Sequence, residues 1–137
     1  TFALGERVGR GLSTGDIVLL FGGLGAGKTL FTKGILNVLG YDTNEVTSPS
    51  FTLVNLYQSS QFDVYHIDLW RLDDNANAAE AVGLNEILEK EDSVTIIEWP
   101  DRMTCDQPAG RVLRVSIEGD GDEPRRITIS SEPTRKI

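Results

Sequence analysis

The sequence predicts an α/β fold with a mixed central sheet, flanked by helices and extended by antiparallel hairpins. A continuous apolar run at residues 17–21 leads into a glycine-rich turn, and a helical pattern follows at residues 30–39. Such a run is typical of a strand buried on both faces of a sheet. Two pairs of short apolar segments farther along indicate hairpins. A length of 137 residues predicts one domain, residues 1–137, with a substantial core.

Periodicity assigns the elements in chain order. The predicted helices are residues 1–12, 30–39 and, in part, 73–91. The predicted strands are residues 17–21, 51–57, 63–69, 94–97, 113–117 and 127–129. Polar turns at 58–61 and 119–124 each join two strands into a hairpin, and the second hairpin is expected to be half exposed. Gly40 is placed to end the second helix in a left-handed conformation.

The charge and composition of the chain limit the kinds of partner that it is expected to bind. The formal net charge is −8 and no run of basic residues occurs, so strong direct binding to nucleic acid is not expected. No apolar run approaches the roughly 18 residues that a membrane span needs, so no membrane partner is expected. The single cysteine, Cys105, cannot form an internal disulfide, which fits a cytoplasmic protein.

The glycine-rich turn carries the strongest functional signal. Residues 22–29 read G-G-L-G-A-G-K-T and fit the phosphate-binding pattern G-x-x-x-x-G-K-[ST], the P-loop. Glycines let consecutive backbone N–H groups face an anion, and the following helix adds the positive end of its dipole. Lys28 is expected to reach the β- and γ-phosphates of a nucleotide, and the Thr29 hydroxyl to bind Mg²⁺. The expected phosphate-binding residues are Gly23, Leu24, Gly25, Ala26, Gly27, Lys28, Thr29 and Leu30.

Two acidic residues at predicted strand ends are candidates for the rest of the site. Glu98 directly follows the strand at 94–97, and Asp68 lies near the end of the strand at 63–69. P-loop enzymes use such an acid to hold Mg²⁺. For Asp68, a competing interpretation is an ion pair with Arg71. For Glu98, it is an exposed position at the end of the strand. His66 alternates in phase with Asp68 and would either orient it or serve a structural role.

Two further features are candidates for nucleotide contact. The loop at 47–50 offers three hydroxyls, Thr47 among them, and would close on the γ-phosphate and Mg²⁺ or form a self-bonded turn. Arg102 would screen a phosphate or remain a solvated surface arginine.

Four segments together resemble one family. Residues 22–29, 47–57 (T-S-P-S-F-T-L-V-N-L-Y), 65–72 (Y-H-I-D-L-W-R-L) and 97–100 (I-E-W-P) are similar to the bacterial tRNA threonylcarbamoyladenosine biosynthesis ATPase family, TsaE. The resemblance implies a single P-loop NTPase-like domain that binds ATP and Mg²⁺. It also implies an accessory subunit required for threonylcarbamoyl modification of adenosine 37 of tRNA. The implied partners are a transferase subunit and its inactive paralogue, which form a complex. ATP hydrolysis is implied to reset this complex between turnovers.

The resemblance also implies roles for individual residues. Lys28 and Thr29 correspond to the P-loop pair, and residues 47–50 to a switch-like loop. Asp68 is the acid of the H-x-D-L-x-R-L segment, and Glu98 is the Mg²⁺ residue at the end of its strand. Lys28, Asp68 and Glu98 are therefore the implied catalytic residues, and Thr29 and Glu98 the implied metal ligands.

The implied nucleotide contact at the beginning of the chain is Thr1, which precedes the first predicted helix. The sequence departs from the family pattern at three positions. Gly23 stands where an acidic residue is usual, Ser50 where threonine is usual, and Trp70 where tyrosine is usual. Of these, Gly23 leaves one carboxylate fewer near the phosphates.

Two other functions fit the same loop. A small-molecule kinase would need an acceptor pocket and an arginine-bearing lid, for which the acidic segment at 73–91 is poorly suited. A non-enzymatic ATP sensor would change its affinity for partners without turnover. A GTPase is disfavoured, because the chain lacks N-K-x-D and the sequence from Asp68 to Arg71 does not fit D-x-x-G.

Overall fold

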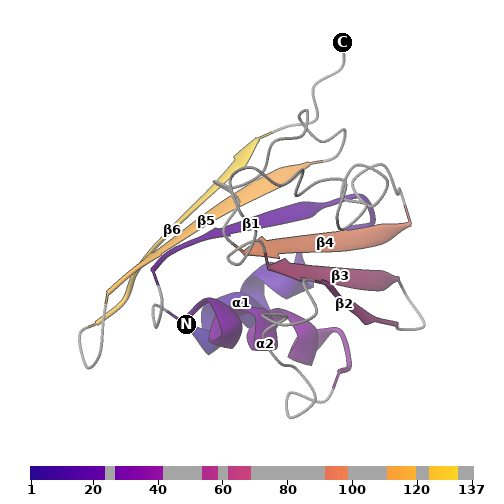
Figure 1. Ribbon diagram of the computed structural model, residues 1–137, viewed down its shortest axis with the longest axis horizontal. Coiled ribbons are helices and arrows are strands. Elements are labelled where there is room, and N and C mark those ends of the chain that lie inside the picture. The colour runs from indigo at the N-terminus through magenta and orange to yellow at the C-terminus, as the bar shows by residue number, and fades with distance from the viewer. Residues whose placement is uncertain are drawn as a thin grey trace.

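The chain is described by a computed structural model that covers residues 1–23, 27–41, 54–58, 62–68, 92–98, 111–119 and 124–132. The elements within these ranges are α1 (Phe2–Arg10), β1 (Ile17–Phe21), α2 (Lys28–Val38), β2 (Val54–Tyr57), β3 (Asp63–Asp68), β4 (Ser93–Glu98), β5 (Val112–Glu118) and β6 (Arg126–Glu132). Both helices lie on the same side of one sheet (Figure 1). Neither α1 nor α2 has the length and apolar character that a membrane crossing requires.

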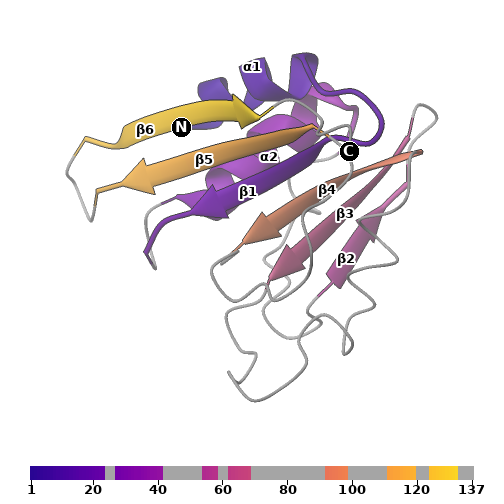
Figure 2. The same ribbon diagram turned by 90° about the horizontal axis from the view of Figure 1, so that it is seen from above.

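The sheet is mixed, as predicted. Its strand order is β2-β3-β4-β1-β5-β6, which Figure 2 shows from above. The pairs β3–β4, β4–β1 and β1–β5 are parallel. The edge pairs β2–β3 and β5–β6 are antiparallel, which confirms both predicted hairpins. The four parallel strands therefore end at one edge of the sheet, and the two antiparallel strands extend its sides.

The central strands are buried on both faces. Val18 and Leu20 of β1 face the helices, whereas Ile17 and Leu19 alternate with them, and all four are at most 3% exposed. Every residue of β4 is buried. This burial explains the continuous apolar run at 17–21 and the mainly apolar segment at 94–97 that predicted these strands.

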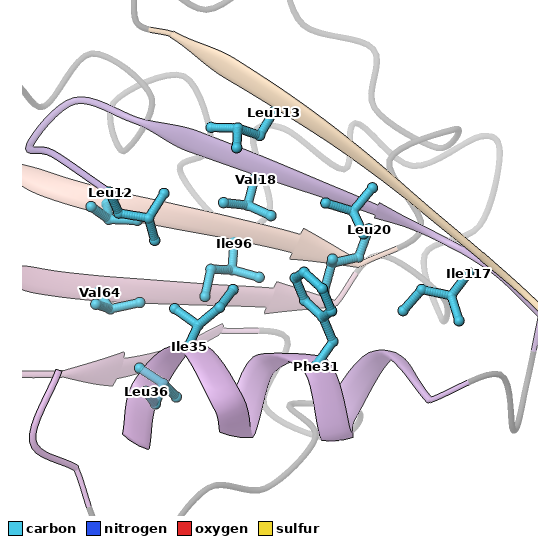
Figure 3. Packing of buried hydrophobic residues seen from close by; sticks show 12 residues of the cluster. Leu12, Val18, Leu20, Phe31, Ile35, Leu36, Val64, Ile96, Leu113 and Ile117 are labelled. Atoms are coloured by element: carbon cyan, nitrogen blue, oxygen red, sulfur yellow. The ribbon is translucent and has the colours of Figure 1, made fainter. Parts of the chain in front are cut away.

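The core lies between the sheet and α2. Phe31 and Ile35 point from α2 toward the strands (Figure 3), and Leu36 of the same helix is also fully buried. The buried cluster comprises Leu12, Val18, Leu20, Phe31, Ile35, Leu36, Val64, Val94, Ile96, Leu113, Val115 and Ile117. Leu4 and Val8 of α1 pack against it. The same apolar periodicity that predicted the two helices thus selects the faces that they bury.

The two helices cross with their backbones in close contact. A Cβ atom built on Gly5 would collide with the carbonyl oxygen of Phe31, and one built on Gly34 would collide with that of Phe2. A Cβ on Gly9 would lie 2.9 Å from the carbonyl oxygen of Ile35. Three glycines therefore allow α1 to lie directly on α2, which fixes where the beginning of the chain is held.

A polar clamp joins the beginning of β1 to the beginning of β5. Arg111 Nη2 donates to Asp16 Oδ2 over 2.6 Å and to the Gly11 carbonyl over 2.9 Å, and Arg111 Nε donates to Asp16 Oδ1 over 3.3 Å. The backbone N–H of Ser13 also donates to Asp16 Oδ2, over 2.8 Å. The carboxylate of Asp16, which is only 5% exposed, is thereby satisfied by a bidentate guanidinium.

The element boundaries differ slightly from the predictions. The second helix begins at Lys28, inside the glycine-rich motif, because the loop leads directly into its first turn. Gly40 has a φ of 92°, which confirms the predicted left-handed residue after that helix. The predicted helix at 73–91 and the loop at 47–50 lie outside the described residues.

Candidate functional site

The candidate acids meet at one edge of the sheet. Asp68 is the last residue of β3 and Glu98 the last of β4, and the two are register partners in the parallel pair. Glu98 is also the register partner of Leu20, beside the point where β1 leads into the glycine-rich loop. In open α/β sheets, ligands bind outside the carboxyl ends of such strands.

These acids lie on the face of the sheet that α2 covers. Register partners in neighbouring strands point to the same face. Leu20 belongs to the core cluster with Phe31 of α2 (Figure 3), so Glu98 and Asp68 share the side of the sheet on which α2 begins. The two carboxylates and the first turn of α2 therefore belong to one region of the molecule.

The first turn of α2 is arranged to receive an anion. Its N-cap is Gly27, in the left-handed conformation with φ 110°, and it makes no side-chain capping hydrogen bond. The first N–H groups of a helix have no acceptor within the helix. Those of Thr29 and Leu30 are therefore available to an anion, which the helix dipole also attracts.

Lys28 is buried against the loop that precedes it. Its side chain is 6% exposed, and Nζ donates to the carbonyl of Gly22 over 2.5 Å and to that of Gly23 over 3.2 Å. The Thr32 hydroxyl, one turn further along α2, donates to the Lys28 carbonyl over 3.0 Å. The ammonium is thereby held at the glycine-rich loop, where the motif requires it.

His66 and Glu98 form a buried pair. His66 Nε2 and Glu98 Oε2 are 2.5 Å apart, and the two residues are 0% and 3% exposed. The sequence leaves open whether His66 orients Asp68 or is structural, and the structure shows that it contacts Glu98 on the neighbouring strand. Asp68 is also buried, at 4% exposed. Three buried ionisable residues therefore lie together at this edge of the sheet, next to an apolar core.

Thr1 lies against the glycine-rich loop. A Cβ atom on Gly27 would be 3.4 Å from Cγ2 of Thr1 and 4.0 Å from its hydroxyl oxygen. The close packing of α1 on α2 holds Thr1 there. The structure thus brings the beginning of the chain to the same loop as Lys28.

Several predicted site residues lie outside the described residues. They are Leu24, Gly25, Ala26, Thr47 and Arg102, together with Arg71, the competing partner of Asp68. Of the remaining predicted contacts, Gly23 is exposed and Leu30 is 46% exposed beside the anion-accepting turn. The described part of the site is therefore Thr1, Gly23, the start of α2 and the two strand-end acids.

The donor chemistry of these residues fits magnesium. Magnesium bound with a nucleotide takes one or two carboxylates, with phosphates and water supplying the rest. The Glu98 carboxylate and the Thr29 hydroxyl are hard oxygen donors of this kind. Within the described ranges, no three His, Cys, Asp or Glu residues form a cage that could hold a metal by themselves. The described residues thus suit an ion that is shared with a phosphate ligand.

Two features of the site could not be found in the sequence. The partner of His66 depends on which strand lies beside β3, and chain order does not give that. The spacing of Gly5, Gly9 and Gly34 is visible in the sequence, but nothing there shows that the glycines face one another across two helices.

Comparison with known proteins adds independent findings. A sequence profile described as threonylcarbamoyl adenosine biosynthesis protein TsaE matches residues 1–127. The tRNA threonylcarbamoyladenosine biosynthesis protein TsaE of Bacillus subtilis is 37% identical over 121 residues, which span 88% of this chain and 73% of that protein. The protein of the same name from Borreliella burgdorferi is 40% identical over 112 residues, 80% of each chain. The one from Treponema pallidum is 36% identical over 126 residues, 92% of this chain and 90% of that protein.

A solved structure supports the fold. The crystal structure of Bacillus subtilis YdiB is similar with a TM-score of 0.70 and 30% identity, covering 93% of this chain and 76% of that one. The predicted P-loop NTPase-like fold is thereby confirmed, and the family profile covers most of the chain. The chain belongs to the TsaE family of threonylcarbamoyl adenosine biosynthesis proteins.

Proposed function

We propose that this chain binds ATP with Mg²⁺ and hydrolyses it as a cytoplasmic accessory subunit in threonylcarbamoyladenosine modification of tRNA. The observation that carries the proposal is the shared edge of the sheet. Asp68 and Glu98 end neighbouring strands there, on the side where the uncapped α2 begins and Lys28 is held. Phosphate-binding donors and acidic residues together are what phosphoryl transfer to water requires.

The chain's donors would bind the triphosphate. The first N–H groups of α2 would donate hydrogen bonds to phosphate oxygens, and Lys28 would add a positive charge that offsets the charge developing on the γ-phosphoryl group. Lys28 already donates to the carbonyls of Gly22 and Gly23, so a phosphate oxygen bound by the ammonium group would compete with these bonds. Lys28 therefore has two tasks, to brace the loop and to bind the phosphate.

Thr29 and Glu98 would hold the magnesium ion. When bound, Mg²⁺ supplies charge neutralisation between the β- and γ-phosphates. The burial of Glu98 keeps its carboxylate from turning into solvent. Glu98→Ala should therefore reduce Mg²⁺-dependent turnover more than it reduces ATP binding.

Asp68 would orient the attacking water. Its place beside Glu98 at the end of β3 allows it either to accept a hydrogen bond from that water or to hold a water of the magnesium shell. Asp68→Asn separates the two roles. Loss of turnover with unchanged Mg²⁺ dependence of ATP binding indicates water orientation, and a weaker Mg²⁺ dependence indicates the shell.

The relatives' names point to the process that the hydrolysis serves. The similar proteins are named tRNA threonylcarbamoyladenosine biosynthesis proteins. Because the net charge is −8, we propose that partner proteins contact the tRNA. The proposed partners are the transferase subunit and its inactive paralogue, and ATP hydrolysis would reset their complex between turnovers.

The direct test is phosphate release with and without these two partner subunits. The proposal expects inorganic phosphate as the product, faster release when the partners are present, and loss of release in Lys28→Ala. A phosphorylated acceptor would instead identify a kinase. Partner binding that follows the nucleotide state without any turnover would identify an ATP sensor.

A further inference from the structure

We infer that His66 is a positioning residue that holds Glu98 for magnesium by tying one of its two carboxylate oxygens. The inference rests on the proposed ATP site, and it concerns a residue that would touch neither the nucleotide nor the metal. The contact behind it is the 2.5 Å distance between His66 Nε2 and Glu98 Oε2.

The surroundings of His66 make packing alone a poor explanation for this residue. His66 is the register partner of Ile96, it follows Val64 on the same face of β3, and it is 0% exposed. A buried polar ring in apolar surroundings costs free energy unless it is hydrogen-bonded. An isoleucine or leucine would fill such a place without that cost. The hydrogen bond to Glu98 is therefore the feature that distinguishes histidine here.

The other ring nitrogen strengthens this conclusion. Across the ranges that the structure describes, Nδ1 of His66 is buried without a hydrogen-bond partner. The polar contact of the ring is thus made through Nε2 alone. The ring is directed toward Glu98 at the expense of its second nitrogen, so the contact with Glu98 takes precedence over satisfying the histidine itself.

The proposed role of Glu98 requires one tautomer of His66. A carboxylate that binds a metal is deprotonated and can only accept hydrogen bonds. A Glu98 that holds the ion therefore needs His66 to donate from Nε2–H. Of the two carboxylate oxygens of Glu98, Oε2 is occupied by the ring and Oε1 is left for the ion. Such outer-shell hydrogen bonds orient ligands and raise metal affinity.

The donated proton also lowers the repulsion between the two acids. Glu98 and Asp68 are register partners, and like charges opposite each other in a sheet are destabilising. An N–H directed at Oε2 offsets part of the negative charge on Glu98. His66 therefore helps to keep both acids at the sheet edge before a cation binds.

The first test reads the ring directly. His66 is the single histidine of the chain, so a long-range ¹H–¹⁵N spectrum contains one imidazole. The inference expects the Nε2–H tautomer in the nucleotide-free protein, and nitrogen shifts that change in Glu98→Ala. A spectrum of the Nδ1–H tautomer, or one that Glu98→Ala leaves unchanged, would overturn the inference without involving ATP.

The second test compares two variants of similar polarity. In His66→Gln the amide nitrogen can reach the position of Nε2, whereas in His66→Asn it reaches only that of Nδ1. ATP binding is measured by calorimetry, once in excess Mg²⁺ and once in EDTA. Loss of an outer-shell partner typically costs about 10–100-fold in metal affinity. In excess Mg²⁺ we expect His66→Asn to lose ATP affinity by a factor in this range and His66→Gln to bind ATP with nearly the wild-type affinity. In EDTA we expect the wild type and both variants to bind ATP equally.

The outcomes separate this inference from the proposed function. Wild-type binding that Mg²⁺ strengthens, with the same strengthening in His66→Asn, overturns the inference and leaves the ATP site standing. Failure of the wild type to bind ATP overturns the proposed function and with it this role of His66. If thermal unfolding shows that His66→Asn does not fold, the ring spectrum and the His66→Gln variant test the inference in its place. A large loss of the Mg²⁺ dependence of ATP binding in a folded His66→Gln variant would also contradict the inference.

Discussion

Replacing Gly34 by alanine tests how closely α1 and α2 pack. A Cβ at this position would lie 3.0 Å from the backbone nitrogen of Glu6, 3.1 Å from Cα of Gly5 and closer still to the carbonyl oxygen of Phe2. All three atoms belong to the backbone of α1, so no side-chain rotation relieves the contact. The helices must separate, because carbon atoms in favourable contact are about 3.5–4.0 Å apart.

The expected loss follows from two opposing terms. Overpacking of a closely packed interior costs about 1–3 kcal/mol, and a clash with backbone belongs at the upper end of that range. Alanine gains back about 1 kcal/mol over glycine through its helix propensity. The net destabilisation is therefore about 2 kcal/mol. For a chain of this size this corresponds to a drop of roughly 6–10 °C in melting temperature.

A matched control isolates the clash. Gly11, just beyond the end of α1, has a φ of −96°, and a Cβ there would meet no atom nearer than 3.7 Å, the carbonyl oxygen of Val8. Gly11→Ala adds the same methyl group and should change stability by less than about 0.5 kcal/mol. Thermal and urea unfolding of both variants supply the comparison. Equal stability of Gly34→Ala and Gly11→Ala would refute the proposed close packing of the helices.

Two further substitutions address other parts of the fold. Arg111→Ala removes the bidentate partner of the buried Asp16 and should lower the free energy of unfolding by about 2 kcal/mol, as urea denaturation can measure. An unchanged urea midpoint would show that the clamp contributes nothing. Thr32→Val removes the buried hydroxyl that donates to the Lys28 carbonyl and should cost about 1 kcal/mol in the same assay. Its ATP affinity should stay near that of the wild type, and a marked loss would mean that this bond shapes the phosphate-binding turn.

The strands were predictable where burial leaves a local pattern. The segment at 17–21 is apolar throughout and the segment at 94–97 is apolar except for Thr95, because β1 and β4 are covered on both faces. The β5–β6 hairpin was predictable for the opposite reason, since Leu113, Val115 and Ile117 are buried while the residues between them are not. The glycine-rich motif was predictable because all of its residues follow one another in the sequence.

Strand order and cross-strand contacts were not predictable in the same way. Nothing local indicates that β1 lies between β4 and β5, because parallel neighbours need not be neighbours in the sequence. From the sequence, His66 could either orient Asp68, with which it shares one face of one strand, or be structural. Neither possibility names Glu98 on the next strand, to which the observed bond runs diagonally. The arrangement of Thr1 beside Gly27 likewise depends on how α1 crosses α2. These features belong to tertiary packing, which local periodicity does not encode.

Calorimetric titration of ATP into the protein at millimolar Mg²⁺ tests the central claim most directly. The claim is that the glycine-rich loop, Lys28 and a magnesium ion together bind the triphosphate of ATP. We expect saturable binding by the wild type and its loss in Lys28→Ala, with Gly11→Ala binding like the wild type. Absence of a binding signal for the wild type, or binding by Lys28→Ala of equal strength, would contradict the claim.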